Sequence, residues 1–446
     1  MSGKVRIIGG GLAGCEAALQ CAQRGVRCEL YEMRPEQKTP AHQTEDLAEL
    51  VCSNSLKSES EFTAPWLLKR EMRLAHSFLL ECADRVAVPA GHALAVDRVA
   101  FAQMVTELVK CKGLINLRRE EVTRISDDGV TILATGPLTS PALSAEIARL
   151  SGSDNLYFYD SISPIVEADS IDRSRVYFAA RYDKGTADYI NCPFTKEEYD
   201  CFYDALIAAQ SVEGHDWERL NYFEGCLPIE EIARRGRDTL RFGPMKPVGL
   251  VDPRNGKMPY AVVQLRQENQ RADSYNLVGF QNHLKFGEQA RVLRLIPGLE
   301  NARFLRYGQI HRNTYINAPS LLGPTLQMQS HPRVLFAGQI CGVEGYVESI
   351  ASGMLAGMNA AALARGQELT APPRATAHGS LVHYITSADP KNFQPANITF
   401  DLLPPLEERV RDRKLRHQKI CERALMEWAE WLKANEVYSS QSTVSS

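Results

Sequence analysis

The chain has 446 residues, of which 44% are hydrophobic and 24% are charged, and its formal net charge is −3. These values are ordinary for a globular protein with room for two or three domains, and they exclude a uniformly basic protein, so any contact with nucleic acid must come from a local basic patch. No apolar run reaches the length of a membrane span and the N-terminus lacks a signal pattern, so we expect a cytoplasmic protein with no membrane contact.

The first elements predict a dinucleotide-binding site. An apolar strand at residues 4–8 leads into a G-x-G-x-x-G pattern, a helix over residues 15–24 and a second strand that ends in an acidic residue. The first glycine permits the tight turn, the second lets the backbone approach a pyrophosphate, the third lets helix and strand pack closely, and the acid can bind an adenosine ribose. The predicted cofactor residues of this stretch are Gly9, Gly10, Gly11, Leu12, Ala13, Gly14 and Glu32.

A second glycine-rich unit near the end of the chain favours FAD over NAD. Residues 333–361 are typical of a strand, a glycine-rich turn and a long helix of small residues. Residues 130–137 are typical of a buried strand before a Gly-Pro turn. A distant unit of this kind that returns to the first Rossmann unit is common in large flavoproteins. The alternative is a Gly/Ala helix that only packs tightly on the sheet. The added cofactor residues are Gly338, Gln339, Gly342, Gly345 and Tyr346.

The middle of the chain has a different character, because aromatic strand-like segments alternate with helices and turns from about residue 169. The sequence therefore predicts an α/β protein with a Rossmann-type FAD-binding domain of the glutathione-reductase class, formed by residues 1–168 and 328–446. A smaller α/β domain, residues 169–327, is inserted into it. No second G-x-G-x-x-G occurs, so NADPH or NADH would have to reach the flavin without a Rossmann domain of its own.

A long helix is expected over residues 406–433, with a buried stripe at three- and four-residue steps. The stripe comprises Val410, His417, Cys421, Ala424, Trp428 and Leu432. The first half of this helix is basic, and it is either a solvated face paired with Glu407, Glu408 and Asp412 or a phosphate-binding surface. The candidate tRNA-binding residues here are Arg409, Arg413, Lys414, Arg416 and Lys419.

The eleven cysteines form no C-x-x-C pair and no metal-like spacing with histidine, which favours reduced thiols and predicts no metal site. Cys226 follows a Glu-Gly turn signal and precedes Arg234, Arg235, Arg237 and Arg241. These arginines could lower the pKa of the thiol or hold phosphates, and the sequence does not choose between the two. Taken alone, a free cysteine is more often a small buried apolar residue.

Several motifs together resemble one enzyme family. They are GGGLAGCEAA near the N-terminus, ELVCSNSLKS at 49–58, ATGPLTS at 134–140, YFEGCLPIEEIARRG at 222–236 and FAGQICGVEGYVESIASGMLAGMNAA at 336–361. On these stretches the chain resembles the bacterial folate- and FAD-dependent tRNA uridine-5-methyltransferases, called TrmFO. Its FAD-binding half is also similar to the larger tRNA wobble-uridine modifying flavoprotein GidA, so the CSNSL and FEGCLP stretches carry the distinction.

The resemblance implies methylation of C5 of uridine 54 in the TΨC loop of tRNA. Methylenetetrahydrofolate would supply the carbon, and reduced FAD, replenished by NADPH or NADH, would supply the electrons. Three other functions are compatible with an FAD-binding fold: a GidA-like modification of wobble uridine, oxidation or reduction of a small molecule, and flavin-dependent RNA binding without catalysis.

The resemblance also implies roles for single residues. It places the nucleophile that adds to uracil C6 on Cys226 and a second catalytic thiol on Cys52, because uracil C5 becomes nucleophilic only after a thiolate has added to C6. Phosphate contacts by the arginines after Cys226 and by the basic C-terminal helix would offset the cost of flipping the base out of its loop. Folate needs a planar surface for its pterin and hydrogen-bond donors for its ring edge, and the candidate folate-binding residues are Gln281, Asn282, His283 and Tyr346.

Overall fold

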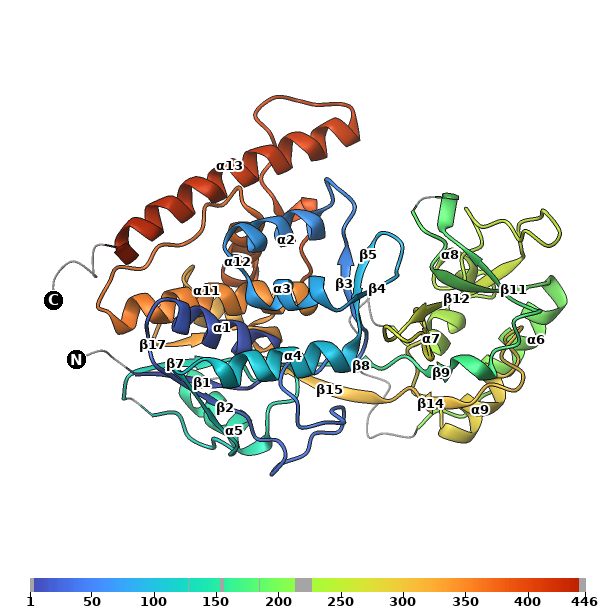
Figure 1. Ribbon diagram of the computed structural model, residues 1–446, viewed down its shortest axis with the longest axis horizontal. Helices are drawn as coiled ribbons and strands as arrows, with labels where there is room; N and C mark the ends of the chain where they lie inside the picture. Colours follow the sequence, from blue (N-terminus) through green and yellow to red (C-terminus); the bar gives the residue numbers. More distant parts are fainter. Residues whose placement is uncertain (1–3, 127, 153–155, 184, 213–226, 441–446) are drawn as a thin grey trace.

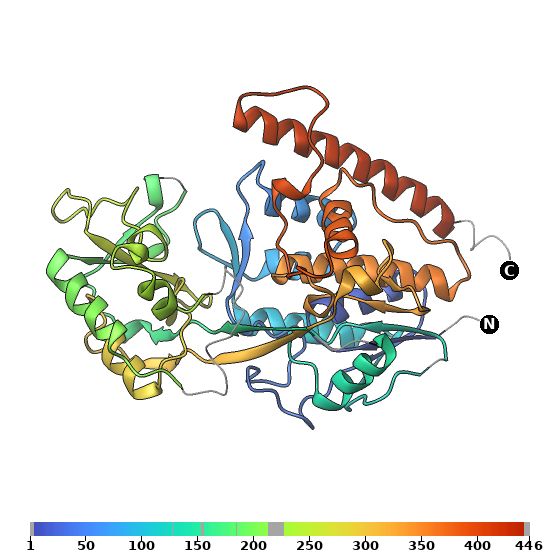
Figure 2. The same cartoon turned by 180° about the vertical axis from the view of Figure 1, so that it is seen from behind.

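The computed structural model describes residues 4–126, 128–152, 156–183, 185–212 and 227–440. Figures 1 and 2 show two units side by side: a larger unit built from the beginning and the end of the chain, and a smaller unit built from its middle. Each unit has its own large buried apolar cluster, and the cluster of the smaller unit runs from Val166 to Ala302. The predicted nucleophile, Cys226, lies outside the described residues.

The larger unit is built on a six-stranded sheet. Across the sheet its strands are β16 (Gln327–Met328), β17 (His331–Phe336), β7 (Val130–Leu133), β1 (Val5–Ile8), β2 (Cys28–Tyr31) and β6 (Ile115–Arg118). All neighbours are parallel except β16 and β17. The helices next to this sheet are α1 (Leu12–Gln23), α4 (Arg98–Cys111), α5 (Pro141–Ser151) and α11 (Tyr346–Ala364). Figure 1 shows α1 and α11 above the sheet and α5 below it, as expected when both faces of a parallel sheet are buried. The predicted Rossmann-type α/β fold is confirmed.

The two longest small-residue stretches, α1 and α11, pack directly against each other. A Cβ atom on Gly353 would lie 2.3 Å from the backbone oxygen of Ala13, and one on Gly357 would lie 2.6 Å from that of Ala17. Both glycines are therefore required by the close approach of the two helices. The glycines inside the long helix thus have a packing role, which the sequence offered as the alternative to a cofactor role.

A second layer of the larger unit consists of a short antiparallel sheet and several helices. The strands are β3 (Ser55–Ser58), β5 (Ala93–Val96) and β4 (Ala87–Val88). The helices are α2 (Ala64–Leu74), α3 (Phe78–Arg85), α10 (Ala318–Leu321), α12 (Ala377–Ser387), α13 (Arg413–Ser440) and the 3-10 turns η5 (Gln339–Cys341) and η6 (Phe400–Leu402).

The basic C-terminal helix begins later than the sequence predicts. We expected a helix from residue 406, but α13 begins at Arg413. Asp412 explains the difference, because its side chain accepts a hydrogen bond from the backbone N–H of Leu415 at 2.7 Å and so caps the first turn. Val410, expected in the buried stripe, precedes the helix, whereas Cys421 and Trp428 are fully buried as predicted.

A buried polar cluster fastens α13 to the body of the larger unit. The Glu71 carboxylate accepts hydrogen bonds from the backbone N–H groups of Ala377 and His378 at 2.7 and 3.0 Å, and lies 2.7 Å from His378 Nδ1. Trp428 Nε1 donates to the backbone oxygen of Glu71 at 2.7 Å, and its ring stacks on that of His378 with centroids 4.3 Å apart. Glu71 therefore joins α2, α12 and α13.

In its described residues, the smaller unit contains an antiparallel six-stranded sheet and four α-helices. Across the sheet the strands are β10 (Tyr177–Ala179), β11 (Tyr189–Phe194), β12 (Ala261–Gln267), β13 (Ser274–Leu277), β9 (Ile165–Glu167) and β14 (Phe304–Arg306). The helices are α6 (Lys196–Ile207), α7 (Ile229–Arg234), α8 (Thr239–Phe242), α9 (Phe286–Leu293) and the 3-10 turns η1 (Ala168–Ser170) and η2 (Arg181–Asp183).

The two units are joined by an antiparallel ribbon of β8 (Leu156–Ser161) and β15 (Ile310–Tyr315). Val166 already belongs to the apolar cluster of the smaller unit, and Tyr315 and Ile316 belong to that of the larger unit. We therefore propose that the chain leaves and re-enters the larger unit along this ribbon, and the predicted boundaries at residues 169 and 327 stay a prediction. Within the described residues, no helix is both long and apolar enough to cross a membrane.

Candidate active site

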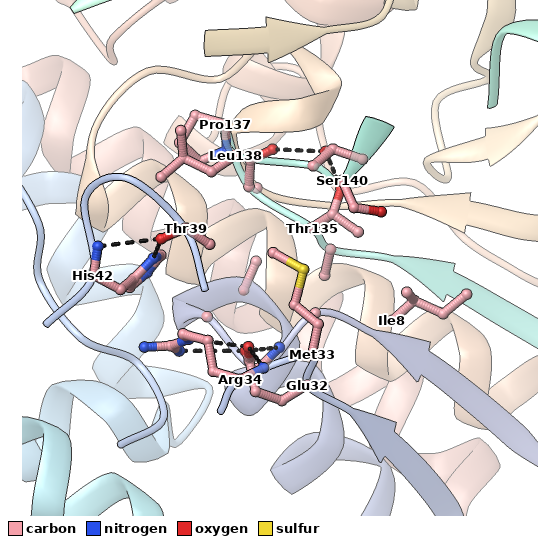
Figure 3. Close-up of a pocket in the computed structure, with 18 of the residues that line it drawn as sticks. Ile8, Glu32, Met33, Arg34, Thr39, His42, Thr135, Pro137, Leu138 and Ser140 are labelled. Carbon is pink, nitrogen blue, oxygen red and sulfur yellow. Dashed lines mark hydrogen bonds and ion pairs between the residues drawn. The ribbon is translucent and has the colours of Figure 1, made fainter. Parts of the chain in front are cut away.

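A cavity opens where the parallel strands β1, β2, β6 and β7 end. This carboxyl edge is where open α/β sheets bind their ligands. Figure 3 shows Glu32 and Arg34 on one side of the cavity, and Pro137 and Leu138 on the other. Nine of the twelve predicted cofactor residues line it: Gly9, Gly10, Gly11, Leu12, Ala13, Glu32, Gly338, Gln339 and Tyr346.

The glycine loop after β1 forms a cradle with the geometry that a dinucleotide needs. A Cβ on Gly14 would lie 1.8 Å from the backbone oxygen of Gly9, so Gly14 serves the close packing of loop and helix. A Cβ on Gly11, in contrast, would meet nothing within 4 Å, so the backbone there faces open space. Gly11 precedes α1 and provides no side-chain cap for it. The N–H groups of the first turn of α1 are therefore available to an anion such as a pyrophosphate.

Glu32, at the end of β2, is held in place by the backbone and by Arg34. Its carboxylate accepts hydrogen bonds from the N–H of Gly10 at 3.1 Å and from the backbone N and Nε of Arg34, both at 3.0 Å. Burial acts to raise the pKa of Glu32, but the hydrogen bonds and charge of Arg34 outweigh it, so the pKa is lowered. Glu32 is therefore an ionised acceptor at neutral pH. Arg34 also pairs with Glu49 at 3.1 Å, which ties the loop after β2 to this side of the cavity.

Part of the lining comes from the second glycine-rich unit, which contributes fewer of the predicted residues than expected. Gly342 and Gly345 are absent from the lining of the cavity. A Cβ on Gly342 would lie 2.3 Å from the Phe393 ring, and one on Gly345 would lie 2.5 Å from Glu348 Oε2. Tight packing thus accounts for these two glycines.

A group of lining residues that follow β6 and β7 was not among the predicted site residues, although the sequence analysis used residues 130–137 as a sign of FAD binding. They share a position at the carboxyl edge of the sheet, next to the glycine loop. The topology rule for parallel sheets would have found them, since the carboxyl ends of parallel strands in one sheet meet at the same edge. They are Glu120, Glu121, Val122, Thr135, Gly136, Pro137, Leu138, Thr139 and Ser140.

Tyr346 connects the cavity to Cys52. Its phenol oxygen accepts hydrogen bonds from the backbone N–H groups of Cys52 at 2.8 Å and Ser53 at 3.2 Å, and it lies 3.0 Å from Cys52 Sγ. Burial, and next the nearby sulfur, hold the pKa of Tyr346 well above its ordinary value, so the phenol keeps its proton at neutral pH. The second predicted thiol does not itself line the cavity, but it contacts a side chain that does.

Two arginines add positive charge around Cys52. Arg98 donates to the backbone oxygen of Leu50 at 2.5 Å and pairs with Glu268 at 2.9 Å. Burial acts to lower the pKa of Arg98, but the attraction of Glu268 and the proximity of Tyr346 and Cys52 raise it. Burial and the repulsion of Arg98 lower the pKa of Arg306, while Cys52 acts in the opposite direction.

The segment that carries Cys52 is clamped by the smaller unit. Asn54 is fully buried, and its Nδ2 donates to the backbone oxygens of Val96 at 3.0 Å and Gln267 at 2.9 Å. Its Oδ1 accepts from Arg266 Nε at 2.9 Å, and Arg266 also donates to Ser53 Oγ at 2.8 Å. Since Gln267 and Arg266 lie on β12, this clamp, made of Ser53, Asn54 and Arg266, fixes Cys52 relative to both units.

An ion pair with a buried carboxylate lies two residues after Tyr346 on α11. The fully buried Glu348 pairs with Lys57 Nζ at 2.6 Å and accepts from the backbone N–H of Ile398 at 3.0 Å. Lys57 also donates to Asn397 Oδ1 at 2.5 Å. Glu344, shortly before Tyr346 in the chain, accepts a hydrogen bond from Gln339 at 2.6 Å.

The predicted folate residues 281–283 lie in the smaller unit and do not line the cavity. Asn282 is fully buried, and His283 is 5% exposed with its Nδ1 2.9 Å from Glu230. The backbone oxygen of His283 accepts from the N–H of Val212 at 2.9 Å, and that of Gln281 accepts from Ile229 at 2.8 Å. Val212, before positions 213–226, and Ile229, after them, are thus both hydrogen-bonded to the backbone of residues 281–283.

The arginines after Cys226 are largely engaged by neighbouring groups. Arg234 pairs with Glu231, and Arg235 is exposed. Arg237 pairs with Asp200 at 2.9 Å and with Asp204, and its guanidinium lies 4.5 Å from the Tyr203 ring centroid. Arg241 pairs with Asp238 at 2.7 Å and lies 3.6 Å from the Tyr260 ring centroid.

The basic residues around the start of α13 differ from those arginines. All are exposed, and within the described part of the chain none is paired with a carboxylate, so the predicted pairing with Glu407, Glu408 and Asp412 does not form. They are the predicted Arg409, Arg413, Lys414, Arg416 and Lys419. No group of three or more His, Cys, Asp or Glu that could hold a metal ion occurs among the described residues.

The fold, the glycine cradle and the returning α11 unit define a Rossmann-type FAD-binding flavoprotein. The family model of Glucose inhibited division protein A matches residues 4–368. A methylenetetrahydrofolate–tRNA-(uracil-5-)-methyltransferase TrmFO of Koribacter versatilis is 70% identical over 443 residues, covering 98% of this chain and all of the relative. A protein of the same name from Solibacter usitatus is 64% identical, covering 95% of this chain and 98% of the relative. The chain belongs to the GidA family and, within it, to the group formed by these TrmFO proteins.

A solved structure supports the fold. That of Aquifex aeolicus GidA has a TM-score of 0.70 at 17% identity and covers 96% of this chain and 73% of its own.

Proposed function

We propose that this protein methylates C5 of uracil in tRNA, at uridine 54 of the TΨC loop, with methylenetetrahydrofolate as the carbon donor. The identity of 70% to a methyltransferase of that name across nearly the whole chain carries the proposal. The cavity next to Cys52 supports it, because the reaction requires a flavin site and a thiol together. We further propose that the protein acts in the cytoplasm.

The lining of the cavity fits FAD. The open backbone at Gly11 and the uncapped first turn of α1 would hold the pyrophosphate, and Glu32 would bind the adenosine ribose. When bound and reduced by NADPH or NADH, FAD supplies the electrons that turn the transferred carbon into a methyl group. Gly338, Gln339 and Tyr346 also line the cavity.

Two thiols would take part in the reaction of the uracil. We assign the nucleophile to Cys226, which lies outside the described residues, and the second catalytic thiol to Cys52. A thiolate that adds to C6 makes C5 nucleophilic, and the C5 proton must then leave. The contact of Cys52 Sγ with the hydroxyl of Tyr346, which lines the cavity, supports a role for Cys52 in this second part of the reaction.

We propose that Tyr346, Gln281, Asn282 and His283 contribute to the folate site. The position of Tyr346 in the cavity wall supports its part. For the other three, the support is their backbone attachment to Val212 and Ile229, since these residues flank the segment that carries Cys226.

The start of α13 is the better supported of the two tRNA-binding stretches. Its exposed cations pair with no carboxylate of the described chain, so they can neutralise phosphates without first breaking such pairs, whereas Arg237 and Arg241 would have to leave Asp200 and Asp238. Figure 1 shows the start of α13 and α8 on the same upper side of the two units. A structured RNA loop could thus contact both.

A nucleoside assay tests the proposal. Purified FAD-loaded protein is incubated with unmodified tRNA transcript, methylenetetrahydrofolate and NADPH, and the digested RNA is examined by mass spectrometry. We expect 5-methyluridine at position 54, and its loss in Cys226→Ala with FAD retained. A flavin that is reduced while tRNA stays unmethylated would instead favour a small-molecule oxidoreductase, and a modified wobble uridine would favour a GidA-like activity.

A further inference from the structure

The contact between Tyr346 and Cys52 determines which of the two groups donates a hydrogen bond. A tyrosine hydroxyl has one hydrogen and two acceptor lone pairs. Both acceptor positions are taken, because the backbone N–H groups of Cys52 and Ser53 donate to this oxygen at 2.8 and 3.2 Å. The remaining contact, 3.0 Å to Cys52 Sγ, is therefore left for the phenol hydrogen.

We propose that Tyr346 is a positioning residue that holds Cys52 in its thiolate form by donating its phenol hydrogen to the sulfur. A hydrogen bond to the charged form of an acid favours that form. The high pKa of Tyr346 supports this direction, because the phenol has its hydrogen available throughout the neutral range.

The charges around the sulfur act in the same direction. Arg98 of α4 and Arg306 of β14 both interact electrostatically with Cys52. Glu268 offsets part of the charge of Arg98, and Glu49 part of that of Arg306. The phenol is the group in direct contact with the sulfur, so we expect its removal to have the largest effect.

The proposal deepens the proposed function, because it gives Cys52 a proton-accepting state beside the cavity. The C5 proton of the uracil adduct would pass to the Cys52 thiolate, the electrons of the C–H bond would remain in the pyrimidine, and Cys52 would become a neutral thiol. Tyr346 would keep its own proton throughout.

The test is the pH dependence of alkylation of Cys52 in the FAD-loaded protein. Iodoacetamide reacts with the thiolate, and peptide mass spectrometry follows each cysteine separately. Cys111 and Cys201 are exposed and serve as internal controls. We expect the midpoint for Cys52 to lie at least about one pH unit below the midpoints of both controls, given the usual strength of a charge-assisted hydrogen bond. A midpoint equal to or above theirs overturns the proposal.

A pair of variants isolates the phenol. Tyr346→Phe should raise the midpoint of Cys52 by about one pH unit with FAD retained. Tyr203→Phe, which removes a 2.9 Å hydrogen bond to Ala233 in the smaller unit, should leave it unchanged. An unchanged midpoint in FAD-loaded Tyr346→Phe overturns the proposal, and if this variant does not fold, the comparison within the wild-type protein decides. Neither measurement requires tRNA or folate, so failure here is separate from failure of the methylation assay.

Discussion

Asn54→Ala tests whether the clamp of Ser53, Asn54 and Arg266 positions Cys52. The substitution leaves the backbone oxygens of Val96 and Gln267 without this donor and removes one acceptor from Arg266. Neutral hydrogen bonds contribute about 0.5–1.5 kcal/mol each, and one to a charged group about 1.5–3 kcal/mol. We therefore expect the free energy of unfolding to fall by about 3–5 kcal/mol, with methyl transfer reduced because Cys52 loses its fixed position.

Asn191→Ala is the matched control. Asn191 is also fully buried, and it donates to the backbone oxygens of Ala179 and Tyr189 and accepts from Gln264, all within the smaller unit. It should lower the free energy of unfolding by about 2–4 kcal/mol through the same kind of loss. Because it does not touch the segment of Cys52, methyl transfer by the folded protein should be preserved.

Urea titration measures unfolding of the whole chain by circular dichroism and unfolding of the larger unit by release of FAD. In Asn54→Ala the two curves should separate, since the link between the units is weakened. A loss below about 1 kcal/mol, or methyl transfer equal to that of Asn191→Ala at matched fractions folded, would refute the idea that the clamp positions Cys52.

Three further predictions concern the cofactor and RNA surfaces. The variant Gly11→Ala should fold normally but bind FAD at least about tenfold more weakly in a flavin titration, because its Cβ would enter the open space above the loop. The control variant Gly113→Ala should change neither folding nor FAD affinity. The pKa of Glu32 is lower in the folded protein than in the unfolded chain, so its charge stabilises the folded protein at pH values above the pKa of the unfolded chain. This contribution is lost as the pH falls through the pKa of the folded protein. Urea curves of wild type and Glu32→Gln should therefore differ at pH 7 and converge in acid, and a difference that does not shrink contradicts the assignment. Arg416→Glu at the start of α13 should raise the KM for tRNA several-fold and flatten its salt dependence, while Lys433→Glu near the far end should have little effect; equal effects would remove this surface from tRNA binding.

The dinucleotide site was predictable because its information is local. The strand, the glycines at fixed spacing, the helix and the terminal acid fall within residues 4–32, so their spacing alone fixes the cradle. The start of α13 was missed although its signal is also local. Asp412 is a good N-cap residue, but the run of charges before it continues the helical pattern and hides the cap.

The surroundings of Cys52 could not be read from spacing. Tyr346 is 294 positions away from Cys52, and Arg266 is 213 positions away from Ser53. No periodicity relates such residues, because tertiary packing alone brings them together. The family resemblance pointed to Cys52, but only the structure shows that Tyr346 and the clamp of Ser53, Asn54 and Arg266 hold its segment.

The contact between α1 and α11 acts as a spacer for the active site. Each helix begins at the cavity, one after Gly11 and the other at Tyr346, and their separation is set by glycines at positions 353 and 357 that admit no side chain. Position 353 lies about two helical turns from Tyr346. A methyl group added there would push the helices apart and displace the phenol from Cys52. Substitutions at the glycines between α1 and α11 should therefore change the affinity for flavin and the reactivity of the Cys52 thiol.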